Sequence, residues 1–130
     1  MRHKADNGRG GQAIVEFALV SVAFFMMVFG TVDLGRAIYM YSQLHNAVRE
    51  GARYGKMNPT DATTIKAKVV AGASTLNLTS ANVTVSCTGG CTSSSTALTV
   101  AASGSFSAIT QDLLGISPFT MSASATAYVE

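Results

Sequence analysis

The chain has 130 residues, of which 48% are hydrophobic and 12% are charged, and its formal net charge is +2. This apolar, charge-poor composition excludes an intrinsically disordered chain and is unusual for a freely soluble domain, while the length predicts one small domain with one long element. The excess positive charge lies in residues 1–11, because residues 12–130 carry equal numbers of basic and acidic side chains. No basic patch with interleaved aromatic residues remains in this neutral body, and we expect no nucleic-acid partner.

Residues 1–11 form a short basic segment without an apolar run, which is typical of a targeting segment. Positive charge before an apolar stretch predicts that this end stays in the cytoplasm and that the chain beyond the stretch faces outward. The alternative is an ordinary secretory signal, which would release an adhesin or binding module that begins after residue 35. Such a signal has a shorter apolar region and a small-residue cleavage site, whereas this run ends at the Asp-Leu-Gly-Arg of residues 33–36.

The apolar stretch at residues 13–32 is predicted to be a helix of about 30 Å, enough to cross one bilayer core. Four small residues interrupt its bulky side chains, at Ala18, Ser21, Ala23 and Gly30. Small residues let neighbouring helices approach one another closely in lipid or in the core of a filament.

Glu16 is the only charged residue between positions 12 and 32. A carboxylate in an apolar span costs several kcal/mol unless it is paired. Cleavage after Gly11 would turn the α-amino group of Gln12 into a cation, which Glu16 of a neighbouring copy could reach. Removing one member of a buried ion pair costs roughly 3–5 kcal/mol, so Glu16 would set the register between subunits. The alternative is an interfacial acid without a task, since snorkelling lowers its cost near the inner membrane face.

Beyond residue 32 the pattern becomes amphipathic, and we expect an apolar stripe that packs against a C-terminal domain. The stripe is predicted to consist of Leu34, Ile38, Tyr41, Leu44 and Val48. Two pairs of opposite charge stand three residues apart, Asp33 with Arg36 and Glu50 with Arg53, and each pair can bond along the helix.

The remaining residues predict a small α+β head. Pro59, Thr60 and Asp61 are a helix-start signal for a second helix that runs to about Asn77. Three stretches alternate between polar and apolar residues and predict an antiparallel sheet of three to four strands. These stretches are residues 82–87, 96–101 and 119–129. Residues 88–90 are expected to form a turn, residues 92–95 a flexible serine-rich tip, and residues 109–114 a helical turn or loop.

Cys87 and Cys91 are the only cysteines and flank the predicted turn. In an oxidising compartment they could form a disulfide, which contributes about 2 kcal/mol for so short a loop and indicates an extracytoplasmic head. The alternative is a pair of free thiols. A metal site is disfavoured, because no His or further Cys stands nearby. We therefore expect a disulfide, no metal and no cofactor.

The motifs of enzyme active sites are missing from the sequence. It has no phosphate-binding loop, no dinucleotide fingerprint and no metal-ligand spacing. The two histidines, His3 and His45, lie in the basic segment and on the long helix, and neither pairs with a nameable nucleophile. We expect a substrate of other enzymes, not an enzyme.

Gly11, Glu16 and Phe17 stand in the order Gly-x4-Glu-Phe before an apolar helix, which resembles the class III (type IV) prepilin signal. The residues that follow resemble the N-terminal signature of TadE-like pilins, which belong to tight-adherence (Flp-type) pilus systems. The matching residues are Val15–Val20, Phe29-Gly30, Asp33, Gly35–Ala37 and Asn46–Gly55.

The resemblance implies a pilin-like α+β fold, with a leader at residues 1–11, a long helix at 12–57 and a head at 58–130. The long helix would have a membrane half at 13–32 and an amphipathic half at 33–55. A short helix and a small antiparallel sheet would make up the head.

The resemblance also implies that a prepilin peptidase cleaves between Gly11 and Gln12, and that Glu16 and Phe17 act in assembly. An assembly platform and its ATPase would then move the chain from the inner membrane into an extracellular adhesive pilus made of pilin subunits. Major Flp-type pilins are much shorter, which favours a minor subunit. The alternative is a single-span, membrane-anchored accessory protein that never polymerises.

Overall fold

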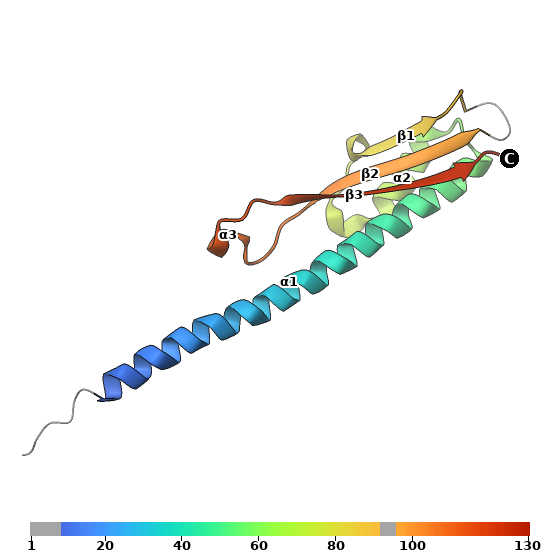
Figure 1. The fold of residues 1–130 in the computed structure, drawn as a ribbon. Helices are drawn as coiled ribbons and strands as arrows, with labels where there is room; N and C mark the ends of the chain where they lie inside the picture. The colour runs from blue at the N-terminus through green and yellow to red at the C-terminus, as the bar shows by residue number, and fades with distance from the viewer. Residues whose placement is uncertain (1–8, 92–95) are drawn as a thin grey trace, which may run out of the picture.

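The long helix α1 (Arg9–Met57) dominates the computed structural model, which describes residues 9–91 and 96–130. Its 49 residues make a rod of about 70 Å at 1.5 Å per residue. The rest of the chain covers the C-terminal half of this rod, and the N-terminal half projects alone (Figure 1). The helix begins at Arg9, inside the leader expected at residues 1–11, and ends at Met57. Residues 1–8 of that leader and the serine-rich tip at 92–95 lie outside the described residues.

Three short helical segments connect α1 to the sheet: α2 (Ala62–Gly72), η1 (Ser74–Leu76) and η2 (Ser80–Asn82). Asp61 caps α2 as predicted, because its carboxylate accepts a hydrogen bond of 3.0 Å from the Thr64 N–H. The prediction that α2 runs to about Asn77 is wrong. The helix ends at Gly72, and Asn77 adopts a left-handed conformation with φ of 47° that an α-helix cannot continue through.

The sheet contains β1 (Val83–Cys87), β2 (Ala97–Phe106) and β3 (Phe119–Tyr128), antiparallel and in the order β1-β2-β3. The short helix α3 (Gln111–Leu114) lies in the β2–β3 connection, where a helical turn or loop is predicted. The predicted end of β2 at residue 101 is wrong by five residues. Ala102 and Gly104 fill buried positions in the extension, and residues this small produce no hydropathy contrast in the sequence.

The core lies between the C-terminal half of α1, α2 and the inner face of the sheet. Both helices and the sheet contribute large side chains that are essentially inaccessible to solvent: Leu44, Val48, Ile65, Val69, Val83, Leu98 and Val100. Full burial of each such side chain contributes about 1.5–3 kcal/mol. The core therefore fixes the head to one half of α1 only.

The apolar stripe predicted on α1 is correct for two of its five residues. Leu44 and Val48 are buried, but Leu34 and Ile38 are each 62% exposed and Tyr41 is 48% exposed. Small residues form much of the true buried face, namely Ala47, Gly51, Ala52 and Gly55. They are needed because the layers approach closely: a Cβ on Gly55 would lie 2.6 Å from Cδ2 of Leu98.

Substitution of Gly55 by alanine should destabilise the protein, although alanine favours helix by about 1 kcal/mol. Overpacking against the buried Leu98 costs about 1–3 kcal/mol and outweighs that gain. The matched control is Gly35→Ala, since a Cβ there meets nothing within 4 Å. Thermal unfolding of the full chain in detergent should show a lower midpoint for Gly55→Ala and an equal or higher one for Gly35→Ala. The reverse order would contradict the close packing.

Candidate assembly site

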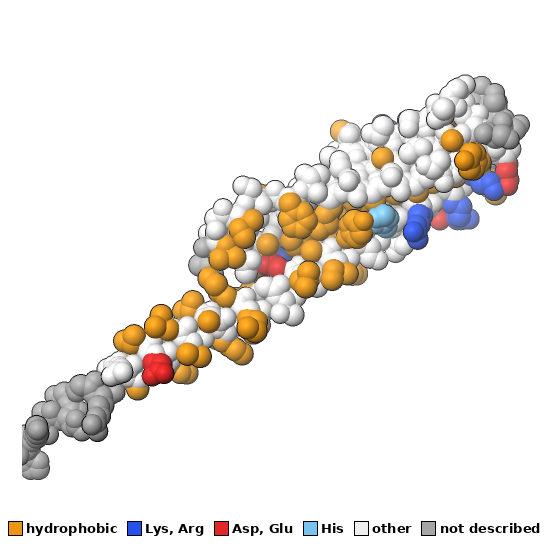
Figure 2. Space-filling view, viewed as in Figure 1, with side chains coloured by type: hydrophobic (Ala, Val, Ile, Leu, Met, Phe, Trp, Pro, Cys, Tyr) orange, Lys and Arg blue, Asp and Glu red, His pale blue; other side chains and the backbone are white. Residues whose placement is uncertain are grey.

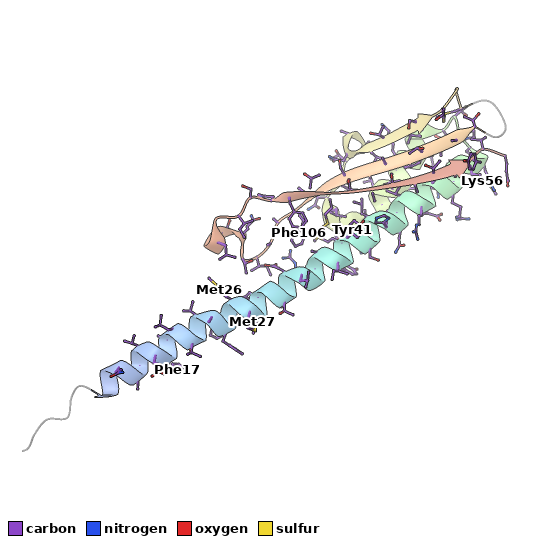
Figure 3. The ribbon with its side chains drawn as sticks, viewed as in Figure 1. Phe17, Met26, Met27, Tyr41, Lys56 and Phe106 are labelled. Carbon is purple, nitrogen blue, oxygen red and sulfur yellow. A yellow bond between two sulfur atoms is a disulfide. The ribbon has the colours of Figure 1, made fainter. Side chains whose placement is uncertain are left out.

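The N-terminal half of α1 has no partner within the described residues. No side chain between residues 11 and 32 is buried, and only Ser21 is even half-buried. Exposure of the large apolar side chains ranges from 38% for Met26 to 74% for Met27, and these two project from different sides of the helix (Figure 3). Among the described residues, α1 is the one helix that is long and apolar enough to cross a membrane. Its apolar surface requires a lipid or protein environment.

Glu16 lies on this exposed half, one position before the labelled Phe17 (Figure 3). Figure 2 shows a single acidic group among the apolar side chains of the projecting rod. Both side chains are exposed, and Phe17 is 73% exposed. Within the part of the chain that is described, the Glu16 carboxylate joins no ion pair and accepts no hydrogen bond. Its partner, if it acts as predicted, must come from outside this stretch of the chain.

Gly11 and Gln12, the expected processing residues, lie in the first turns of α1. Both are exposed, and a Cβ on Gly11 would meet nothing within 4 Å. The helix continues across the bond between them without interruption. Glycine weakens a helix by about 1 kcal/mol relative to alanine, which lowers the cost of local opening at Gly11.

Asp33 marks the boundary between the exposed half of α1 and the half that carries the head. It is 6% exposed and accepts four hydrogen bonds. The N–H groups of Ile109 and Thr110 donate at 2.8 and 3.0 Å, and the Thr110 hydroxyl donates at 2.9 Å. The predicted pair with Arg36 is confirmed at 3.0 Å. Asp33 thereby ties α1 to the β2–β3 connection, a contact that sequence reasoning missed.

The hydrogen bonds to Asp33 favour its charged form. The Ile109 N–H is the largest cause, and together with Thr110 and Arg36 it lowers the pKa of Asp33 from its ordinary value of 3.8 to about 2, against the opposing effect of desolvation. The Arg36 guanidinium also lies over the Phe106 ring at 5.6 Å from the ring centre. The carboxylate is thus ionised and fully engaged at any physiological pH.

The Cys87–Cys91 disulfide closes a turn at the end of β1, far from Asp33 along the sheet. The structure contains the pairing that the sequence predicts, with 5.3 Å between the two Cα atoms. Gly89 and Gly90 in the turn have φ of 88° and 96°, which only glycine adopts without strain. The described residues contain no group of three or more His, Cys, Asp or Glu side chains placed to hold a metal ion.

Replacement of Asp33 by asparagine should lower the midpoint of thermal unfolding. Asparagine offers one acceptor oxygen where three N–H or O–H donors of the connection converge, and its NH2 group would face some of them. Asp112→Asn is the matched control, since Asp112 is an exposed acid on the same connection. Equal midpoints for the two variants would contradict a stabilising role of Asp33.

The same variant tests the pKa. Because the pKa of Asp33 is lower in the folded chain, its contribution to stability is full above about pH 4 and is lost as the pH falls through about 2. Unfolding midpoints measured over this range should fall more steeply for the wild type than for Asp33→Asn.

Comparison with known families gives a match that covers the exposed half of α1 and continues past Asp33 along the same helix. Residues 11–53 match the model of the family described as TadE-like protein, which is associated with Tad pilus assembly. Searches of curated proteins and of solved structures find no match to the chain. The long helix, short helix and three-stranded antiparallel sheet form a pilin-like α+β arrangement. Residues 11–53 of this chain are therefore a TadE-like family domain.

Proposed function

We propose that the chain is a structural subunit, a pilin or minor pilin, of a tight-adherence type IV pilus that serves surface attachment. The observation that carries the proposal is the uncovered apolar half of α1, which is continuous with a head that has its own core. The TadE-like match over residues 11–53 includes this half and supports a Tad pilus context. In this role the chain is processed and assembled by other proteins and has no catalytic activity of its own.

Before assembly, residues 13–32 of α1 span the inner membrane. A continuous helix satisfies its own backbone hydrogen bonds, which is what a chain in lipid requires. The basic residues of the leader hold the N-terminus in the cytoplasm and leave the head outside. The Cys87–Cys91 disulfide supports this orientation, because such bonds persist in oxidising compartments.

A prepilin peptidase then cuts between Gly11 and Gln12 and creates a new α-amino group at the start of α1. The new cation and the Glu16 carboxylate of an adjoining subunit neutralise one another when α1 helices pack side by side. Lipid is as apolar as the helices, so burial of apolar surface contributes little to this transfer, and close packing and polar pairing must drive it. The ion pair selects the register, and Phe17 packs beside it.

The assembly platform and ATPase of the pilus machine act on the membrane-embedded subunit and extract α1 as the filament grows. The head stays folded throughout, since its core uses only the C-terminal half of α1. Its outer surface then coats the filament and makes the contacts of adhesion.

Mass spectrometry of fibres sheared from the cell surface tests the proposal. We expect the chain to be present in the fibres and to begin at Gln12, with the Cys87–Cys91 disulfide intact. A chain that is found only in membranes would indicate the non-polymerising accessory protein. A chain that still begins at Met1 in the envelope would refute processing, and one that begins after residue 35 would indicate a secreted module.

A further inference from the structure

The β2–β3 connection at residues 107–118, called here the boundary loop, lies beside the point where α1 leaves its apolar half. The bonds from Ile109 and Thr110 to Asp33 fix this position. Figure 1 shows α3, within the boundary loop, at the end of the head that is nearer to the projecting rod. Asp33 follows directly after residues 13–32, so the boundary loop lies level with the outer end of the proposed span.

Exposed apolar side chains gather in this part of the head. Beyond residue 57, the described large hydrophobic residues with exposed side chains are Ile109, Leu114, Ile116, Phe119 and Tyr128. Four of these five lie within or directly after the boundary loop, with exposed fractions between 48% and 57%. The exposed Ile38 of α1 and Phe119 also line a shallow groove of about 460 Å³. The head therefore presents apolar surface continuous with that of the span, as Figure 2 shows.

Charged side chains are concentrated at the opposite end of the head. Among residues 97–119 the sequence has one charged residue, Asp112, whereas Arg49, Glu50, Arg53 and Lys56 lie near the far end of α1. Figure 2 shows the basic groups clustered at that far end. The head is thus amphipathic along its length, with its apolar end toward the proposed membrane.

We propose that the boundary loop lies in the lipid headgroup region on the outer face of the inner membrane before the subunit is assembled into the pilus. This inference rests on the membrane stage of the proposed function. Apolar side chains on a polar backbone bind at the boundary between headgroups and acyl chains, about 5–10 Å deep. The loop therefore gives the membrane-bound subunit a second contact with lipid and fixes how the head sits on the bilayer. Arg36, still 38% exposed beside Asp33, lies at the level of lipid phosphates.

Single-tryptophan variants test the proposal directly, because the chain contains no tryptophan. The full-length protein is reconstituted in vesicles of phosphatidylcholine and phosphatidylglycerol whose acyl chains carry bromine close to the headgroup or deep in the bilayer. Ile116→Trp reports on the boundary loop, with Leu114→Trp as a second reporter. Leu19→Trp reports on the span, and Tyr128→Trp on the far end of the sheet. Far-ultraviolet circular dichroism confirms that each variant is folded.

We expect bromine near the headgroup to quench the tryptophan fluorescence of Ile116→Trp and Leu114→Trp more strongly than deep bromine does. The emission maximum of these two variants should lie at a shorter wavelength than that of Tyr128→Trp. Leu19→Trp should be quenched, and Tyr128→Trp should not.

If the loop variants behave like Tyr128→Trp while Leu19→Trp is quenched, this inference fails, but the proposal that residues 13–32 span the membrane is retained. If Leu19→Trp escapes quenching, the membrane stage fails and the inference fails with it. A blue shift without quenching that grows with the protein-to-lipid ratio would assign the loop to a second copy and overturn the lipid contact.

Discussion

The hydrogen-bonded carboxylate of Asp33 couples the two parts of this molecule, a bare apolar rod and a folded head. The head packs on α1 through the buried Leu44 and Val48 and through glycines at which side chains of the head approach the helix closely. Asp33 accepts three hydrogen bonds from residues 109 and 110 and so fixes the head at one height on the rod. Together with the core, this contact sets the position of the head relative to the apolar half.

Two acids of α1, Glu16 in its exposed half and Asp33 at the boundary of that half, have opposite environments. Asp33 is buried, and the chain itself supplies its partners. Glu16 is exposed in apolar surroundings, and the described residues offer it none. An acid that is satisfied within the subunit stabilises the fold, whereas one left open in an apolar environment needs a partner from another molecule. This contrast is why we assign a structural role to Asp33 and propose an assembly role for Glu16.

Local patterns in the sequence were sufficient for the main elements. The apolar run predicted the long helix, the Asp61 cap predicted the start of α2, and the cysteine spacing predicted the Cys87–Cys91 disulfide. Hydropathy does not predict the buried positions that small residues occupy. Gly51 and Gly55 belong to the buried face of α1, while the more hydrophobic Leu34 and Ile38 are exposed.

The bonds between Asp33 and residues 109–110 could not be predicted, because partners 76 and 77 positions away leave no local signal. The sequence does show that Asp33 is an acid at the end of an apolar run, but it also predicts Arg36 as the partner of Asp33. The roles of Gly11, Gln12, Glu16 and Phe17 remain predictions, since they concern a cleaved chain in contact with other subunits.

The central claim, that the charge of Glu16 is paired between subunits, is tested by the content of Glu16→Gln in sheared fibres. Glu50→Gln is the matched control, because it removes the same charge from an exposed position of the same helix. We expect Glu16→Gln to enter the membrane and to be processed at Gln12, yet to be strongly depleted from fibres, while Glu50→Gln assembles normally. Fibres that contain Glu16→Gln at the level of the wild type would contradict the account.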